Sequence, residues 1–423
     1  MLPRFQQLFF AFVSLTAGVG ATAAVHEALS TIAVTNIEDI RGHIHLPATS
    51  NGHPVSWRSS DPDILSGDGL VKRQSSDKDV LLVASIELDG QLHEREFNAS
   101  VRRAVQAEPF EAYAFSYFTG NSVDGEKIYL AASNGNNALD WQELNGGKPV
   151  LTSTLGTKGL RDPFVIRSVE GDTFYLIATD LSIGSGTSWG DAVRKGSLYL
   201  EIWESHDLIE WSEQRHVKVS PDNAGNTWAP EAFWDSEKNS YVVFWASSLY
   251  NTEDHSDDSY HRMFYSLTRD FVTFSEPEIW QDTKTSRIDT TVLKSGDSFY
   301  RFTKDEGSAS GCTDIIQEKS SSLLAGVSDW AVQATCIGAD AGLQAVEGPT
   351  AFKSNADDAH GEKFYLFVDE YGGRGYVPLE TDNLDAPDWK VSADYKLPTS
   401  PRHGTVIPIT ATEHEKLMSA FGA

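Results

Sequence analysis

Five residues that could carry acid–base chemistry recur at nearly regular intervals along the chain. Four are acidic and one is a histidine: Asp162, Glu231, Asp289, Glu347 and His403. The steps between them are 69, 58, 58 and 56 residues (231 − 162, 289 − 231, 347 − 289 and 403 − 347). If the chain repeats one structural unit at this period, the five side chains converge, and carboxyls held close together have separated pKa values. One ionised and one protonated carboxyl are what acid–base hydrolysis requires.

Each of these residues also has a purely structural interpretation. Asp before Pro, as in Asp162-Pro163, is a common turn element, and acidic residues often stand at strand ends. His403 could be a channel histidine satisfied by hydrogen bonds as readily as a ligand. The register shared by five units favours a common site over five unrelated turns.

The segments that must position these residues are predicted to be β-strands, since helical periodicity is nearly absent. A strand of the type Phe-Tyr-Leu follows each of the four acidic residues: Phe174–Asp180, Tyr241–Ser247, Phe299–Glu306 and Phe364–Glu370. Units of about 60 residues with several short strands each are typical of propeller blades.

The fifth unit is divided between the two ends of the chain. The strand Arg402–Thr410 is followed by only 13 residues, Ala411 to Ala423, so it has no downstream partner. Strands of the missing types occur instead at Ala112–Gly120, Glu126–Ser133 and Asn137–Leu144. We therefore predict an all-β fold in which residues 108–412 form a five-bladed β-propeller, closed by pairing of its last strand with its first.

The region before the propeller is predicted to contain two parts. Residues 1–23 have the charged start, apolar core and Ala21-Thr22-Ala23 pattern of a secretory signal peptide. Residues 26–104 alternate short apolar runs with turn clusters, which predicts an antiparallel β-sandwich. The stretch VSWRSSDPDILSGDGLVKR resembles bacterial immunoglobulin-like domains, which implies a spacer or stabilising module, with weak glycan binding as the alternative.

Composition excludes some partners and indicates a compartment. The formal net charge of −27 disfavours nucleic acid and anionic membranes, so a neutral partner is expected. The protein is also expected to be a monomer. A secreted protein can pair its two cysteines, Cys312 and Cys336, although two buried thiols are the alternative. Asn98-Ala99-Ser100 is a sequon for N-glycosylation.

The repeated motifs LRDPFVI, TWAPEAFW, RIDTTVL, VEGPTAFK and RHGTV together resemble glycoside hydrolase family 43. That family has five-bladed propellers and hydrolyses arabinose- or xylose-containing polysaccharides with inversion. The resemblance implies that Asp162 is the general base, Glu347 the general acid, and Asp289 the carboxylate that tunes the acid and holds the sugar.

The resemblance also suggests residues around these three. Glu231 is expected to shape the site wall, and Arg374 to hold a sugar hydroxyl. His403 matches a histidine that, in many members, binds a central calcium ion or its water shell, although calcium prefers oxygen ligands. Trp228 and Trp189 could stack on sugar rings, with core or rim aromatics as the alternative.

The expected function is that of a secreted exo-acting α-L-arabinofuranosidase that acts on arabinan, arabinoxylan or related oligosaccharides and requires no cofactor. β-Xylosidase, galactofuranosidase and endo-arabinanase activities remain alternatives within the family. A retaining sucrose- or fructan-active propeller lacks support, because its Asp-Pro-Asn-Gly motif does not occur. A non-catalytic glycan-binding propeller is the alternative from another class.

Overall fold

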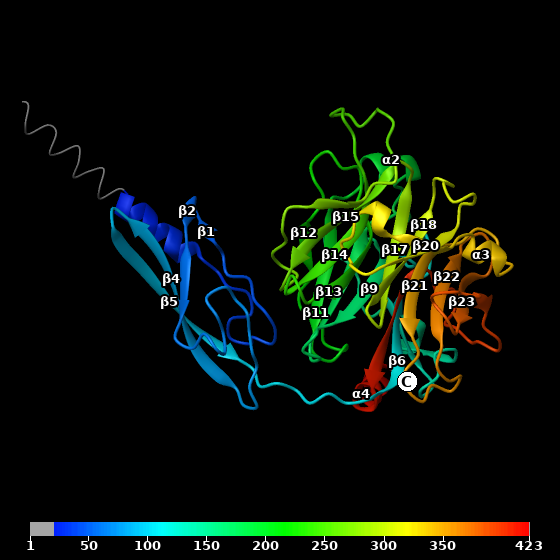
Figure 1. Cartoon of the computed structure of the whole chain (residues 1–423), viewed down its shortest axis with the longest axis horizontal. Coiled ribbons are helices and arrows are strands. Elements are labelled where there is room, and N and C mark those ends of the chain that lie inside the picture. Colours follow the sequence, from blue (N-terminus) through cyan, green and yellow to red (C-terminus); the bar gives the residue numbers. More distant parts are fainter. Residues whose placement is uncertain (1–20, 423) are drawn as a thin grey trace, which may run out of the picture. The chain divides into compact units, whose positions relative to one another are not determined.

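The computed structural model describes residues 21–422 and divides the chain into two compact units, Met1–Gln106 and Ala107–Ala423 (Figure 1). The predicted signal peptide falls outside the described residues except for positions 21–23. Those three positions begin a helix that continues to residue 31. Between residues 21 and 422, none of the helices is long and apolar enough to span a membrane.

The first unit is a small domain built on one three-stranded sheet. Its main sheet has the order β3-β4-β5, and a short ribbon pairs β1 with β2. The strands are β1 (Thr49–Ser50), β2 (His53–Pro54), β3 (Ser56–Ser59), β4 (Lys78–Leu88) and β5 (Gln91–Val101). The helix at residues 21–31 and the loops that hold Ile40, Ile44 and Leu46 pack against neighbouring parts of one face of the sheet.

The predicted sandwich is therefore incomplete in the described residues. A helix and irregular loops cover the face of the sheet where a second full sheet was expected, and they bury its apolar side chains in place of that sheet. Asn98 is exposed on β5, an edge strand of this sheet.

The second unit consists of five antiparallel sheets of four strands each (Figure 1). The first four sheets, in order from the innermost strand, are β9 (Leu160–Arg167), β10 (Phe174–Asp180), β11 (Tyr199–Ser205), β12 (Arg215–Lys218); β13 (Trp228–Asp235), β14 (Ser240–Ser248), β15 (His261–Thr268), β16 (Glu278–Gln281); β17 (Arg287–Ser295), β18 (Ser298–Asp305), β19 (Ile315–Ser320), β20 (Ala331–Ala334); and β21 (Glu347–Lys353), β22 (Phe364–Glu370), β23 (Gly375–Thr381), β24 (Lys390–Val391).

The fifth sheet joins the two ends of this unit, as predicted. Its order is β25 (Gly404–Thr410), β6 (Phe110–Tyr117), β7 (Tyr129–Ser133) and β8 (Trp141–Glu143). Strand β25 pairs with β6 from Gly404 opposite Tyr117 to Thr410 opposite Phe110. The remaining helical segments are η1 (Asn145–Gly147), α2 (Trp189–Arg194), η2 (Val327–Asp329), α3 (Ile337–Asp340) and α4 (Ala411–Phe421).

Five apolar cores hold the sheets in a ring. Each core is shared by two neighbouring sheets, and the fifth sheet shares one core with the fourth and another with the first. The fold is thus a five-bladed β-propeller, and the expected closure is confirmed. Because every innermost strand contacts the next one around the ring, residues at matching strand ends meet on one face.

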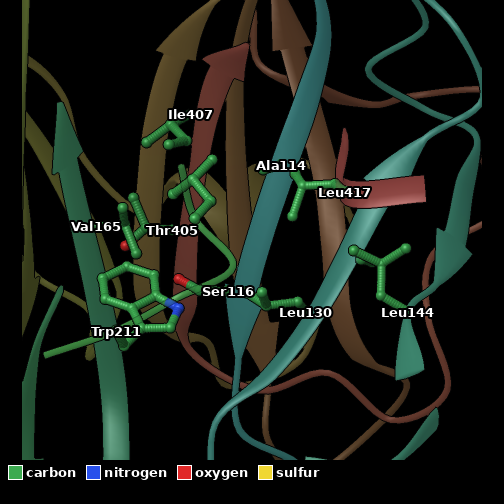
Figure 2. Close-up of a pocket in the computed structure, with 11 residues that line it drawn as sticks. Ala114, Ser116, Leu130, Leu144, Val165, Trp211, Thr405, Ile407 and Leu417 are labelled. Carbon is green, nitrogen blue, oxygen red and sulfur yellow. The ribbon is translucent and has the colours of Figure 1, made fainter. Parts of the chain in front are cut away.

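The junction between the fifth and first blades is slightly underpacked. A cavity of about 10 Å³ lies at this junction. Figure 2 shows the side chains that line it, which come from both blades and from α4. Ser116 and Trp211 face this cavity, and neither the Ser116 Oγ nor the Trp211 Nε1 has a hydrogen-bond partner within the described residues. A space of this size holds one water molecule at most.

Candidate active site

A β-bulge interrupts four of the five innermost strands at the same place. Strands β9, β13, β17 and β21 each shift register against their partner strand near their first residues. The residue in each bulge has a positive φ: Asp162 (49°), Ala229 (48°), Asp289 (50°) and Gly348 (55°). Three of these are not glycine, although the left-handed region costs other residues about 1–2 kcal/mol. Such strain, repeated at one end of the ring, is typical of a functional site.

These bulges correct the predicted alignment of the acidic residues. Asp162 and Asp289 occupy equivalent positions, whereas Glu231 follows its bulge residue by two positions and Glu347 precedes its own by one. His403 lies just before β25, whose register shift is at its opposite end. The sequence period was counted between acidic residues, but the backbone repeats at the bulges. Glu231, Glu347 and His403 therefore enter the ring at different depths from Asp162 and Asp289.

His403 contacts the base predicted from the sequence, Asp162. The His403 Nδ1 lies 3.5 Å from the Asp162 Oδ1, and the Thr179 hydroxyl donates to the Asp162 Oδ2 at 2.9 Å. Burial opposes the ionisation of Asp162, but the nearby His403, the charge of Arg161 and the Thr179 hydroxyl lower the pKa of its carboxyl. For His403, burial favours the neutral ring, but Asp162, Asp289 and Glu231 raise its pKa to about 9. Asp162 is thus an ionised carboxylate beside an imidazolium.

Asp289 is held by the neighbouring blade. The backbone N–H of Gly348 donates to the Asp289 Oδ2 at 3.0 Å. Burial and the charge of Asp162 raise the pKa of Asp289 to about 6, although His403 acts in the opposite direction. This carboxyl is 8% exposed, so it can contact only a ligand that enters the ring.

Glu347, the predicted acid, lies beside an arginine from the closing strand. The Arg402 Nη2 is 3.5 Å from the Glu347 Oε1, and the Arg402 Nε also contacts the Asp369 Oδ2. Burial and the charges of Asp289 and Asp369 raise the pKa of Glu347 to about 8, while Arg402 lowers it. The side chain remains 30% exposed, which leaves it accessible from solvent. Glu347 is therefore protonated at neutral pH and open to a substrate.

Glu231 is 3% exposed and lies between the second and third blades. Burial raises its pKa to about 8, although His403 and a hydrogen bond with Thr291 act against this. A protonated, buried carboxyl fits the expected role in the site wall.

Two tryptophans and a histidine form an aromatic cluster near the start of β13. Trp228, at the start of β13, stacks on His261 with ring centroids 5.2 Å apart, and Trp189 meets Trp228 edge-on at 6.3 Å. Trp189 is 48% exposed on α2, and the Arg161 guanidinium lies over its ring. Trp189 thus offers an open face to a ligand, whereas the Trp228 ring stacks on His261.

Among the described residues, Arg374 forms no ion pair with Asp162, Asp289 or Glu347. Its guanidinium pairs with Glu370 at 2.8 Å and is half exposed on the turn between β22 and β23. Arg402 instead provides the guanidinium beside Glu347. Sequence reasoning missed Arg402, although it stands directly before His403 in the quoted motif.

The calcium ion that the resemblance allows at His403 does not fit the donors around that residue. The only group within residues 21–422 whose ligand atoms lie close enough for a metal ion is elsewhere, at Asp180, Glu201 and His216. The protonated imidazole already places a positive charge among Asp162, Asp289 and Glu231.

A disulfide and a short helix shape one side of the site. Cys312 and Cys336 are joined by a disulfide bond, which ties the loop after β18 to the start of α3. Lys304 is fully buried, and its ammonium group donates to the backbone carbonyls of Thr313 and Val346. It thus connects this loop to the residue before Glu347.

This arrangement can transfer protons in opposite directions at one place. Asp162, an ionised carboxylate on β9, and Glu347, a protonated carboxyl on β21, lie at the same end of the propeller. Strand β25 lies between β9 and β21 in the ring of innermost strands. The carboxylate can accept a proton from water, and the carboxyl can donate one to an oxygen.

Comparison with known proteins identifies relatives of both units. Residues 108–415 match a family model described as a probable glycosyl hydrolase domain related to glycoside hydrolase family 43. Residues 22–104 match one described as an atrophied bacterial Ig domain. An α-L-arabinofuranosidase of Bifidobacterium longum subsp. longum is 33% identical over 386 residues, which cover 78% of this chain and 36% of that protein. The chain thus spans about a third of the length of that relative.

Two solved structures are similar at low identity. One is an α-L-arabinanase of Cellvibrio cellulosa, with 13% identity, a TM-score of 0.45, and coverage of 68% of this chain and 93% of that one. The other is an endo-1,4-β-xylanase of Bacteroides thetaiotaomicron, with 11% identity, a TM-score of 0.45, and coverage of 69% and 93%. The family match, and not these structural likenesses, identifies the family.

Proposed function

Because the chain belongs to the glycoside hydrolase 43-related family, we propose that it is an inverting glycosidase that releases L-arabinofuranose from arabinan, arabinoxylan or related oligosaccharides. One observation carries the proposal: the pKa of Asp162 is lowered and that of Glu347 is raised to about 8 at the same face of the ring. The choice of sugar follows the arabinofuranosidase of Bifidobacterium longum.

In the proposed mechanism, Asp162 and Glu347 act on opposite sides of the scissile bond. Asp162 accepts a proton from the attacking water, and the proton on Glu347 passes to the leaving oxygen. The water oxygen forms the new bond to the anomeric carbon while the glycosidic bond breaks, so the sugar is released with inverted configuration. Asp289 raises the pKa of Glu347 through its charge, which keeps the acid protonated until the leaving group needs the proton.

The surrounding residues would position the sugar and the acid. We assign Trp189 to stacking on a sugar unit outside the ring, since its face is exposed. Arg402 holds Glu347 and Asp369 in place. Trp228 and Glu231 support this arrangement from the second blade, and His403 supports it from the start of the fifth. Arg374 reaches a substrate only if that substrate extends over the turn that holds its Glu370 pair.

We also propose that the protein is secreted and acts as a monomer outside the cell. The signal-peptide pattern at residues 1–23, the disulfide and the exposed sequon asparagine, Asn98, support this assignment. The strong negative charge is compatible with neutral polysaccharides as partners.

A panel of aryl glycosides and plant polysaccharides tests the activity. The panel compares α-L-arabinofuranoside, β-D-xyloside and β-D-galactofuranoside, and proton NMR of the fresh product identifies its anomer. Release of arabinose with inversion is expected. Retention of configuration would exclude the mechanism, and release of xylose or galactose alone would exclude the sugar.

Two variants separate the roles of the carboxyls. Asp162→Asn should lower kcat about 10³-fold or more on every substrate. Glu347→Gln should do the same on polysaccharide but far less on an aryl glycoside whose leaving group needs no proton. Asp235→Asn, at the opposite end of β13, is the control and should retain full activity. Equal activity of all three variants would contradict the enzyme assignment.

A further inference from the structure

Three side chains on the first blade converge at a place that the proposed reaction does not use. Asp180 ends β10, Glu201 lies on β11, and His216 lies on β12. One potential ligand atom from each lies within 4.8 Å of the other two. Glu201 pairs across the sheet with Ala178 on one side and His216 on the other, so the three side chains share one face of the blade.

The two carboxylates of this cluster are removed from water. Asp180 is 3% exposed and Glu201 is fully buried. The one side chain within ion-pair distance of Glu201 among the described residues is His216, whose Nδ1 lies 2.5 Å from the Glu201 Oε1. Within the same residues, no Lys or Arg forms an ion pair with Asp180 or Glu201. Two neighbouring buried carboxylates repel each other unless a proton or a cation lies between them.

A surrounding layer of contacts fixes the orientation of each member. The Thr157 backbone N–H and hydroxyl both donate to the Asp180 Oδ1 at 2.7 Å. The Gln214 amide donates to the Glu201 Oε2 and to Ser153, and the Tyr199 ring stacks on His216 at 4.1 Å. Metal ligands are commonly oriented by such second contacts.

The loop that covers the cluster has a glycine where no other residue fits. A Cβ on Gly156 would lie 2.2 Å from the Asp180 Oδ2, and Gly156 has a φ of +54°. The backbone therefore closes directly over the carboxylate. His216 is 25% exposed, which leaves a path from solvent to the cluster.

We propose that Asp180, Glu201 and His216 bind one divalent cation of the borderline class represented by Zn²⁺. Two carboxylate oxygens and one imidazole nitrogen suit such an ion, whereas Ca²⁺ and Mg²⁺ prefer sites made of oxygen alone. The ion neutralises the buried carboxylates and holds the loop of residues 152–158 against the blade. Because Thr179, the residue before Asp180, donates to Asp162, the ion supports the strand end that carries the proposed base.

The test uses untagged, full-length protein that has been treated with a chelator and desalted. Isothermal titration with Zn²⁺ should give one site per chain, and Ca²⁺ should bind at least about 10-fold more weakly. Zn²⁺ should also raise the melting temperature in proportion to its saturation of the site. These readouts do not depend on activity, so failure of the glycosidase proposal would leave them unchanged.

Two variants locate the site. Glu201→Gln and His216→Gln should each weaken Zn²⁺ binding roughly 100-fold or more. The partly exposed His216 provides a variant that folds even if the Glu201 change does not. Glu204→Gln, which lies on the same strand and removes the carboxylate that pairs with Arg215, is the control and should bind Zn²⁺ normally.

Three outcomes would overturn the proposal. In the first, the unmodified protein binds Zn²⁺ no more tightly than His216→Gln does. In the second, Glu204→Gln loses as much Zn²⁺ affinity as the two site variants. In the third, the protein binds Ca²⁺ more tightly than Zn²⁺. Any of these would leave the cluster as a Glu–His pair with a shared proton.

Discussion

Gly348 lies so close to His403 that a Cβ built on its backbone would stand 2.7 Å from the Cβ of His403. The same glycine donates its backbone N–H to Asp289. The fourth and fifth blades therefore meet at a point where one residue has no side chain. That point connects the imidazolium beside Asp162 with the carboxyl proposed to tune Glu347.

Replacement of Gly348 by alanine should displace His403 and reduce activity. The new methyl group collides with a buried ring, and the left-handed backbone adds a cost of about 1 kcal/mol. We expect kcat to fall about 10-fold or more, with a lower melting temperature. Gly296→Ala is the matched control, because Gly296 also has a φ of +57° but nothing lies within 4 Å of its added Cβ. If the two variants lose the same stability and neither loses activity, the contact with His403 has no functional role.

Two substitutions should shift the alkaline limb of the pH–rate profile in opposite directions. Activity requires protonated Glu347, so kcat/KM should fall as the pH rises through about 8. Asp289 raises the pKa of Glu347 and Arg402 lowers it. Asp289→Asn should therefore move the limb to lower pH, and Arg402→Gln should move it to higher pH.

The profile is measured with an activated aryl substrate, so that residual activity of the Asp289 variant is detectable. Shifts in the same direction in both variants would show that Glu347 does not set this limb. Arg402→Lys keeps the charge and should leave the limb near its original position.

The ring closure was predictable because the sequence shows which strands of each repeated unit are present and which are missing. The strand after His403 had no downstream partner, and the segment from Ala112 had no upstream one. Each needed a neighbour to cover its edge, so their pairing followed. The period also predicted that the four acidic residues lie near the first residues of the innermost strands, where the structure places them.

The depth of each side chain was not predictable, because it depends on bulges. A bulge adds a residue to one strand and leaves no unique mark in the sequence. Pro163, Pro230 and Pro349 follow three of the bulge residues and would have given the correct register, but Thr290 takes that place in the third blade.

The sequence could not show which arginine, Arg374 or Arg402, lies beside Glu347, because that depends on contacts in the folded protein. Arg374 was favoured because glycines flank it, yet its guanidinium pairs with Glu370. Likewise, Glu201 and His216 are 15 residues apart (216 − 201), and only the pairing of β11 with β12 brings them together.

The stability of the protein should decline between about pH 6.5 and pH 9 because of His403. The folded pKa of about 9 is above the ordinary value of 6.5, so the stabilisation is fully present below pH 6.5 and is lost as the pH rises through 9. The difference corresponds to about 3 kcal/mol. His403→Gln should have a lower melting temperature at pH 6 and a smaller decline towards pH 9. His360→Gln, on an exposed turn, is the control and should follow the unmodified protein. Parallel curves for His403→Gln and the unmodified protein would show that His403 is not held as an imidazolium.

The closure of the ring should depend on Glu413, which joins three elements. Its carboxylate pairs with both terminal nitrogens of Arg167 on β9, at 2.6 and 2.7 Å, and accepts the N–H of Thr410 at the end of β25. Both side chains of this pair are less than a fifth exposed, so loss of the charge leaves Arg167 poorly compensated. Glu413→Gln should lower the free energy of unfolding by about 2 kcal/mol, whereas Glu415→Gln, on the exposed face of α4, should change it little.

Deletion of residues 402–423 removes β25 and α4 entirely and should prevent folding of the propeller unit, because β6 becomes an uncovered edge and two apolar cores lose their closing strand. Circular dichroism and limited proteolysis compare this deletion with Glu413→Gln and Glu415→Gln. The loss of folding should be greatest for the deletion, smaller for Glu413→Gln and least for Glu415→Gln. A truncated protein that remains folded and active would contradict the closure, since it would show that four complete blades and an open fifth are sufficient.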